Sequence, residues 1–307
     1  MKILLFGKNG QVGWELQRAL APLGELTALD FDSPGPLSAD FSRPESLAST
    51  VRALKPDVIV NAAAHTAVDK AEAEPELAEA INASAPAVLA REAAACGAWL
   101  AHYSTDYVFD GSGSHARAED APTGPLSVYG RSKLAGEEAI RASTCRHLIL
   151  RTSWVYAARG GNFARTMLRL AAERERLTVI DDQIGAPTGA ELLADITAHA
   201  LRTLQQRPEL GGTYHAVAAG ETSWHGYAGF VIEWARRHGH SLRVPSDAIE
   251  AVPTSAFPTA ARRPLNSRLD TAKLSRAFGL RLPSWQQGVE RMLIEVLGER
   301  VPAPPTP

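Results

Sequence analysis

The chain has few of the residues that would connect it with an oxidising compartment, nucleic acid or a membrane. Its 307 residues include only two cysteines, Cys96 and Cys145, which we expect to be reduced thiols and which are too few for a cysteine metal site. The net charge of −2 gives no electrostatic reason for a nucleic-acid partner. No apolar run approaches the ~20 residues of a membrane span, and residues 1–7 are too short for a signal-peptide core. We therefore expect a cytoplasmic enzyme or binding protein.

The sequence does contain a regular alternation of apolar runs and helical stretches. Apolar runs at residues 2–6, 26–29, 57–64, 99–109 and 147–156 are typical of buried parallel strands. The stretches between them have the composition of helices or loops. This alternation predicts an α/β fold with a Rossmann-like, doubly wound parallel sheet.

A glycine-rich turn follows the first of these predicted strands. Gly7, Gly10 and Gly13 have the spacing G-x-x-G-x-x-G and precede a helical stretch. The order strand, glycine turn, helix is the phosphate-binding opening of a dinucleotide fold, although a plain turn is the alternative. Asp30 ends the next predicted strand, near the place where a carboxylate binds ribose hydroxyls in such folds. The pattern favours a nucleotide cofactor site.

Tyr129 and Lys133 form the candidate catalytic pair. Residues four apart on a helix share one face, so the lysine ammonium is expected near the tyrosine phenol. A free tyrosine has a pKa of ~10, and a nearby positive charge lowers it by roughly 1–3 units. The pair is therefore a candidate proton donor. Upstream, Thr105 and Asp106 stand at the end of a predicted strand, where ligands of open α/β sheets bind.

Beyond residue 156 the alternation loosens and predicts a second part of the protein. We assign residues 1–152 to a NAD(P)-binding Rossmann domain, to which the chain returns around 182–240. Residues 153–300 are assigned mainly to a smaller, discontinuous α/β substrate domain. Residues 301–307 contain four prolines and are expected to form a frayed tail.

These patterns together resemble the extended short-chain dehydrogenase/reductase superfamily. The segments that carry the resemblance are the glycine turn, residues 61–64 (NAAA), residues 104–106 (STD) and the Tyr129/Lys133 pair. Longer segments narrow the resemblance to the dTDP-4-dehydrorhamnose reductases of that superfamily, from residue 1 to about 298. These segments include 61–72, 104–111, 128–137, 151–156, 182–195 and 263–270.

The resemblance implies transfer of a hydride from NADPH or NADH to the C4 ketone of dTDP-4-dehydro-β-L-rhamnose, which gives dTDP-L-rhamnose. It implies that Tyr129 donates the proton, that Lys133 holds the nicotinamide ribose and lowers the pKa of Tyr129, and that Thr105 hydrogen-bonds the ketone oxygen. The implied cofactor residues are Gly7, Gly10, Gln11, Val12, Gly13, Asp30, Asp40, Phe41, Ala62, Ala63, Ala64, Tyr129 and Lys133. The implied substrate residues are Val68, Thr105, Asp106, Tyr107, Trp154, Arg263 and Arg268, with the two arginines on the diphosphate.

The resemblance also implies assembly and metal binding. A homodimer is expected, with Mg²⁺ held near the dimer contact by Glu15, Glu191 and Glu290, because the family often binds the ion there. A small nucleotide sugar is the expected partner, with neither nucleic acid nor membrane. Solvated surface glutamates are the alternative to a metal site.

Two other functions stay open at this point. One is a nucleotide-sugar epimerase or dehydratase of the same superfamily, and the other is a non-catalytic NADP-binding regulatory subunit. Dehydratases of this group carry an Asp-Glu pair after the threonine, whereas here Thr105 is followed by Asp106 and Tyr107. The complete set of Thr105, Tyr129 and Lys133 argues against a regulatory subunit. Three of these residues have structural alternatives. Trp154 would be a core residue, Asp106 would cap a turn, and Arg268 would pair with a surface carboxylate.

Overall fold

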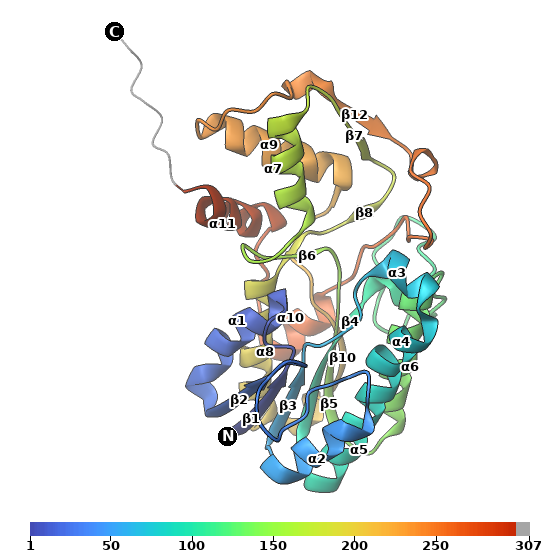
Figure 1. The fold of residues 1–307 in the computed structure, drawn as a ribbon, viewed down its shortest axis with the longest axis vertical. Coiled ribbons are helices and arrows are strands. Elements are labelled where there is room, and N and C mark those ends of the chain that lie inside the picture. The colour runs from blue at the N-terminus through green and yellow to red at the C-terminus, as the bar shows by residue number, and fades with distance from the viewer. Residues whose placement is uncertain (299–307) are drawn as a thin grey trace.

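The computed structural model describes residues 1–298, so the tail predicted at 301–307 lies outside the described residues. Figure 1 shows a larger lower part built around a central sheet and a smaller upper part that contains α7, α9 and α11. Within residues 1–298, no helix combines the length and apolarity needed to cross a membrane.

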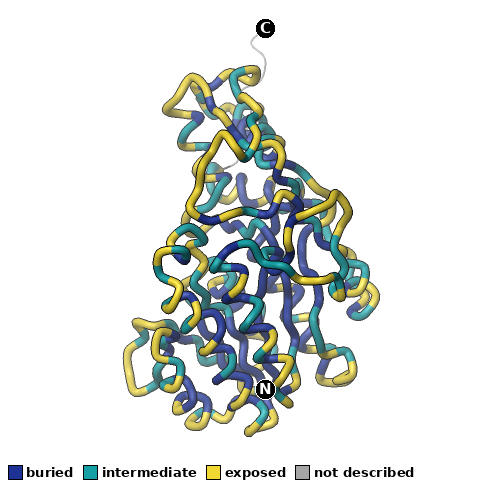
Figure 2. Tube along the Cα trace, turned by 90° about the vertical axis from the view of Figure 1, so that its right-hand side faces the viewer, coloured by how far each residue is buried: buried dark blue, intermediate teal, exposed yellow. Residues whose placement is uncertain are grey.

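The central sheet has six parallel strands in the order β10-β5-β4-β3-β1-β2. The strands are β1 (Lys2–Phe6), β2 (Glu25–Leu29), β3 (Val58–Asn61), β4 (Trp99–Thr105), β5 (Arg146–Thr152) and β10 (Gly212–His215). Most side chains of β1, β3, β4 and β5 are buried on both faces, which explains the nearly continuous apolar runs in the sequence, whereas the edge strand β2 is only partly buried. Figure 2 shows these buried strands inside an exposed outer layer.

Helices cover both faces of this sheet. One face packs against α1 (Gln11–Leu20), α8 (Ala190–Leu204) and α10 (Ala272–Phe278) through Leu16, Leu193 and Leu274. The other face packs against α2 (Glu45–Leu54), α5 (Ala85–Cys96) and α6 (Val128–Ala142) through Leu47, Leu89 and Ile140. The predicted doubly wound α/β fold is confirmed.

The connection from β3 to α5 is interrupted several times. It consists of α3 (Val68–Ala73), α4 (Pro75–Glu79) and a π-helical turn (Ala80–Ser84). Within the π turn, the Asn82 side chain accepts the N–H of His65 and donates to the carbonyl oxygen of His65, at 2.9 and 3.0 Å. These bonds tie the loop after β3 to the helical layer.

The upper part is built from segments that leave and rejoin the sheet. It contains β6 (Val155–Tyr156), α7 (Phe163–Glu173), β7 (Leu177–Ile180), β8 (Ile184–Gly185), β9 (Thr188–Gly189), β11 (Thr222–Ser223), α9 (Trp224–Arg237), β12 (Ile249–Val252) and α11 (Trp285–Leu297). Short two-stranded pairings join β6 to β9, β7 to β12 and β8 to β11. An aromatic core that includes Tyr156, Tyr227 and Trp285 holds the helices together. Between these segments the chain returns to the sheet with α8, β10 and α10.

Candidate active site

The glycine turn after β1 brings three pieces of backbone close together. Gly7 has a left-handed φ of +84°, and a Cβ there would lie 2.7 Å from the backbone of Ala62 and Ala63. A Cβ on Gly13 would lie 1.8 Å from the carbonyl oxygen of Gly7. Gly10 caps α1 without a side-chain hydrogen bond, so no side chain blocks the first N–H groups of the helix. The turn can therefore accept an anionic group at the helix N-terminus.

A cleft of about 400 Å³ opens beside this turn at the carboxyl ends of β1, β2 and β3. Eight of the predicted cofactor residues line it: Gly7, Gly10, Asp30, Asp40, Phe41, Ala62, Ala63 and Ala64. Gln11, Val12 and Gly13 lie at the start of α1 and do not line the cleft. Phe31, Ala39, Ser42 and Ile81 also line it, and the sequence interpretation missed them. The Phe31 side chain is 77% exposed. The only sign of its role in the sequence was a large aromatic residue directly after Asp30.

Two carboxylates lie in the cleft with different partners. Asp30 accepts backbone N–H groups from Asn9 and Phe31, at 3.0 and 2.8 Å. Asp40 accepts from Ser42 and from the Arg43 guanidinium, at 2.8 Å for the latter. The Ser42 hydroxyl and then Arg43 lower the pKa of Asp40. Both carboxylates are therefore oriented by nearby donors and can accept hydroxyl groups in the cleft.

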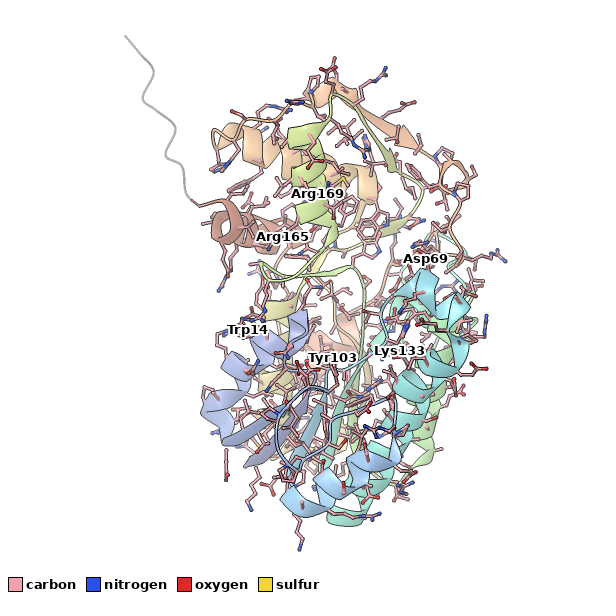
Figure 3. All side chains as sticks on the ribbon, in the orientation of Figure 1. Trp14, Asp69, Tyr103, Lys133, Arg165 and Arg169 are labelled. Atoms are coloured by element: carbon pink, nitrogen blue, oxygen red, sulfur yellow. The ribbon has the colours of Figure 1, made fainter. Side chains whose placement is uncertain are left out.

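Thr105, Tyr129 and Lys133 come together at the carboxyl end of β4. Thr105 is the last residue of β4; its hydroxyl donates to Asp106 Oδ1 at 3.1 Å and lies close enough to the Tyr129 phenol to lower the pKa of Tyr129. Lys133 follows Tyr129 by one turn of α6 and is 2% exposed. Figure 3 shows Lys133 and Tyr103 near the upper ends of the strands, below Asp69 on α3. The predicted catalytic residues are thus assembled in one place, and Thr105 and Tyr129 are called the hydroxyl pair below.

The start of α6 is fixed by local contacts. The Ser127 hydroxyl accepts the N–H of Gly130 at 3.1 Å and caps the helix. A Cβ on Gly130 would lie 2.4 Å from the carbonyl oxygen of Tyr107, so glycine allows the helix to approach that backbone. The Tyr107 ring packs edge-on against the Tyr129 ring, with centroids 5.4 Å apart. These contacts hold the Tyr129 ring in place.

Groups other than Lys133 set the pKa of Tyr129 in this structure, so the expected effect of Lys133 stays a prediction. Burial raises the pKa of Tyr129 to about 12, Thr105 opposes the rise, and Asp106 adds to it. The Lys133 Nζ donates to the carbonyl oxygen of Tyr103 at 2.6 Å. Burial lowers the pKa of Lys133 itself to about 8, against a smaller raising effect of Glu137. Tyr129 therefore carries its proton at neutral pH.

Asp106 and Tyr107, two of the residues predicted for the sugar, contact the hydroxyl pair, Thr105 and Tyr129. Val68 begins α3, and Asp106 begins a 3-10 turn (Asp106–Val108) directly after Thr105. Burial raises the pKa of Asp106 to about 6, against hydrogen bonds from Ser267 and Thr105. One Asp106 oxygen is buried without a partner. A polar group of a ligand could satisfy it.

Trp154 stands in a strained conformation between the two parts of the protein. Its φ is +50°, which side-chain-bearing residues seldom adopt. Its ring stacks on Trp224 with centroids 3.7 Å apart and planes 15° apart. Trp224 was not predicted, and a tryptophan directly after the capping Ser223 was its only sign in the sequence. The stacked pair forms a flat wall above the sheet.

Both predicted diphosphate arginines are held by carboxylates. Arg263 donates twice to Asp69, at 2.7 and 3.2 Å. Arg268 donates to Glu221 at 2.7 Å. A diphosphate would have to compete with Asp69 and Glu221 for these guanidinium groups.

The three glutamates predicted to bind a metal do not lie together. Glu15 and Glu191 line the same hollow, but the third glutamate there is Glu295, because Glu290 is exposed elsewhere on α11. Burial raises the pKa of Glu191, and the negative charges of Glu15 and Glu295 add to this effect against Arg291. Among residues 1–298, no three acidic, cysteine or histidine side chains are grouped closely enough to hold a metal ion.

Comparisons with known proteins agree on one family. A family model described as RmlD substrate binding domain matches residues 1–297. A dTDP-4-dehydrorhamnose reductase from Shigella flexneri is 60% identical over 296 residues, which are 96% of this chain and 98% of that protein. Among solved structures, a dTDP-4-dehydrorhamnose reductase from Clostridium acetobutylicum is 32% identical with a TM-score of 0.86, covering 96% of this chain and 99% of that one. The enzyme from Bacillus anthracis, solved in complex with NADP, is 34% identical with a TM-score of 0.84, covering 96% and 100%.

Proposed function

The chain belongs to the dTDP-4-dehydrorhamnose reductase family, and we propose on that basis that it reduces the C4 ketone of dTDP-4-dehydro-β-L-rhamnose to give dTDP-L-rhamnose. The reductant is NADPH or NADH, which supplies the hydride when it is bound. The observation that carries the proposal is the placement of Thr105 beside the Tyr129 phenol at the carboxyl end of β4, close enough to lower the pKa of that phenol. This pair lies where an open α/β sheet places its ligand.

The cofactor fits the cleft beside the glycine turn. The uncapped start of α1 would receive the pyrophosphate, and Asp30 would accept the ribose hydroxyls. Lys133 would hold the nicotinamide ribose from α6. Gly10, at the start of α1, and Asp30 both line the cleft, which supports the first two roles.

The two hydroxyl groups divide the work on the ketone oxygen. Thr105 donates a hydrogen bond as negative charge develops there, and Tyr129 transfers its proton to the same oxygen. The raised pKa of Tyr129 suits this role, because the phenol keeps its proton until a stronger base, the nascent alkoxide, is present. The hydride and this proton together convert the ketone into a hydroxyl group.

We assign substrate binding to the residues around this pair. Val68, Asp106, Tyr107 and Trp154 would enclose the sugar, and Arg263 and Arg268 would reach the diphosphate. This matches a division in which residues 1–152, with a return around 182–240, bind the cofactor and residues 153–300 mainly bind the nucleotide sugar. The contribution of α8 and β10 to the sheet supports that return.

The alternative functions fit the site less well. A dehydratase needs a second acidic group after Asp106, but Tyr107 occupies that position and packs against Tyr129. A regulatory subunit would not need the assembled pair of Thr105 and Tyr129. Consumption of the cofactor separates these cases, because a dehydratase or epimerase regenerates it within each turnover.

We also propose a cytoplasmic location and a homodimer. Cys96 and Cys145 are both free thiols, which agrees with a reducing compartment. Trp14 is 46% exposed beside the hollow that contains Glu15 and Glu191, so this surface is our candidate for the dimer contact.

Replacement of Tyr129 by Phe tests the proposed reaction. The variant keeps the ring and its packing but loses the proton, so kcat should fall about 10²–10⁴-fold with little change in NADPH affinity. The measurement is the loss of NADPH absorbance with dTDP-4-dehydro-β-L-rhamnose, together with identification of the sugar product by NMR. Tyr214→Phe is the matched control, because that buried hydroxyl donates to the Leu210 carbonyl away from the site. A Tyr129→Phe enzyme with near wild-type kcat would overturn the assignment.

A further inference from the structure

A buried row of polar side chains connects β3 with the lysine of the proposed site. Asn61 ends β3, and His102 is its register partner on β4. Asn61 Nδ2 lies 3.0 Å from His102 Nδ1, and His102 Nε2 lies 3.2 Å from Lys133 Nζ. These three residues are 1%, 1% and 2% exposed. Their hydrogen bonds must therefore be satisfied within the protein.

The orientation of the Asn61 amide follows from a second contact. The backbone N–H of Ala63 lies 3.1 Å from Asn61 Oδ1. If the amide were reversed, its NH₂ group would face this N–H, and two donors would meet. Asn61 Oδ1 therefore accepts from Ala63, and Asn61 Nδ2 donates to His102 Nδ1. This contact leaves His102 Nδ1 as an acceptor without a proton.

The proton of His102 must then lie on its other ring nitrogen. Burial, and to a smaller extent the charge of Lys133, hold the pKa of His102 well below its ordinary value, so the ring is neutral. A neutral imidazole carries one proton, which Asn61 excludes from Nδ1 and which therefore lies on Nε2. That N–H points toward Lys133 Nζ. An ammonium group has only donors, whereas a neutral amine has a lone pair that can accept this hydrogen bond.

Other groups around Lys133 do not make the same distinction. The carbonyl oxygen of Tyr103 accepts from Lys133 in either charge state. Glu137, one turn further along α6, favours the ammonium, but it is shared with Arg151 through bonds of 2.9 and 2.7 Å and with Arg141. Tyr129, on the other side of Lys133 along the helix, keeps its proton and is neutral at neutral pH. His102 is thus the contact whose hydrogen bond depends on the lysine charge.

We propose that Asn61 locks His102 in its Nε2–H tautomer, and that this N–H makes His102 a positioning residue that favours the amine form of Lys133 over the ammonium. The consequence for catalysis rests on the proposed function, in which Lys133 serves the ketone reduction. A free lysine, with a pKa of ~10.4, stays charged throughout the neutral range. The fixed Nε2–H tautomer of His102, called the lock below, brings the titration midpoint of Lys133 closer to neutral pH. Near that pH the lysine can take up and release a proton during turnover.

The first test needs no variant and no substrate. Two-bond ¹⁵N–¹H correlation spectra of histidine-labelled protein identify which ring nitrogen of His102 carries the proton, and His102→Leu assigns the signal. The lock predicts a protonated Nε2 and an unprotonated Nδ1 at neutral pH. A proton on Nδ1, or a cationic ring, would overturn the proposal even if the enzyme proved to be fully active.

The second test uses the direction of a titration shift. The chain has six lysines, so the Lys133 signal can be followed by side-chain NMR and assigned with Lys133→Met. If His102 opposes the ammonium, His102→Leu should raise the Lys133 midpoint by about one pH unit, a tenfold change in proton affinity. If His102 instead accepts from the ammonium, the midpoint should fall. An unchanged or lowered midpoint contradicts the lock.

Two further variants separate the lock from general disruption. Asn61→Asp keeps the shape and still accepts from Ala63, but its second oxygen would draw the His102 proton to Nδ1. The tautomer should then invert and the Lys133 midpoint should rise, and an unchanged tautomer would contradict the role of Asn61. His147→Leu is the control, because this histidine on β5 contacts the Cys145 carbonyl and should leave the Lys133 midpoint unchanged. A comparable shift in His147→Leu would show that the response is not specific to His102.

Discussion

Glu137→Gln should destabilise the protein strongly, although it changes only one charged group. The Glu137 side chain is fully buried, the Arg151 side chain is 2% exposed, and they share two hydrogen bonds of 2.9 and 2.7 Å. Glutamine has nearly the same shape and keeps one acceptor oxygen. It nevertheless leaves the Arg151 guanidinium buried between β5 and α6 with no full negative charge beside it.

The expected loss follows from that uncompensated charge. Removing one partner of a buried ion pair costs about 3–5 kcal/mol. Because the glutamine oxygen and the Glu119 carbonyl can still accept from Arg151, we expect about 3 kcal/mol. The exposed pair of Arg169 and Glu173 gives the contrast, since Glu173→Gln should cost about 0.5 kcal/mol or less.

Urea unfolding followed by circular dichroism at pH 7 measures both losses. Burial of Glu137 raises its pKa, but Arg151 outweighs this and the pKa is lowered overall. A lowered folded-state pKa means that the pair stabilises the protein above the unfolded pKa, ~4.3 for glutamate, and that this contribution is lost as the pH falls through the folded value. Replacing both partners, as Glu137→Met with Arg151→Met, should cost less than Glu137→Gln alone. A Glu137→Gln loss below about 1 kcal/mol would refute the reasoning.

Two further predictions concern ligands. We expect the enzyme to use both cofactors. Asp30→Ala should reduce kcat/KM with NADH by about 10–100-fold, because the variant loses charge-assisted hydrogen bonds to the ribose. The activity with NADPH should be spared, because the Asp30 carboxylate repels the 2′-phosphate of that cofactor. Equal losses with both cofactors would remove Asp30 from the ribose. Arg268→Ala should weaken dTDP-sugar binding in calorimetry, whereas Glu221→Gln, which releases Arg268 from its ion pair, should strengthen it. If both variants weaken binding alike, the pair serves the fold and not the diphosphate.

The sequence predicted best what depends on local patterns. The apolar runs gave the parallel strands, and the glycine spacing placed Gly7, Gly10 and Asp30 at a common cleft. Both inferences need only the order of neighbouring elements along the chain. The sharing of one helix face by Tyr129 and Lys133 was predictable for the same reason.

Contacts between distant segments were not predictable in this way. The spacing along α6 predicts that Lys133 lies one turn after Tyr129. It does not predict the contact between Lys133 and His102, because that histidine lies on a strand 31 residues earlier in the chain. The position of Glu290 outside the hollow of Glu15 and Glu191 has a related cause. Five residues of helix turn the side-chain direction by roughly 140°, at 3.6 residues per turn, so only Glu295 reaches the hollow of Glu15.

The return of the chain to the sheet through α8, β10 and α10 limits how the protein can fold and unfold. Since β10 pairs with β5 and α8 covers the sheet, the lower part cannot complete its core until much of the upper part has been synthesised. Several connecting segments, rather than one linker, join the two parts (Figure 1). This multiple connection couples the two parts in unfolding, so we expect one cooperative transition instead of two.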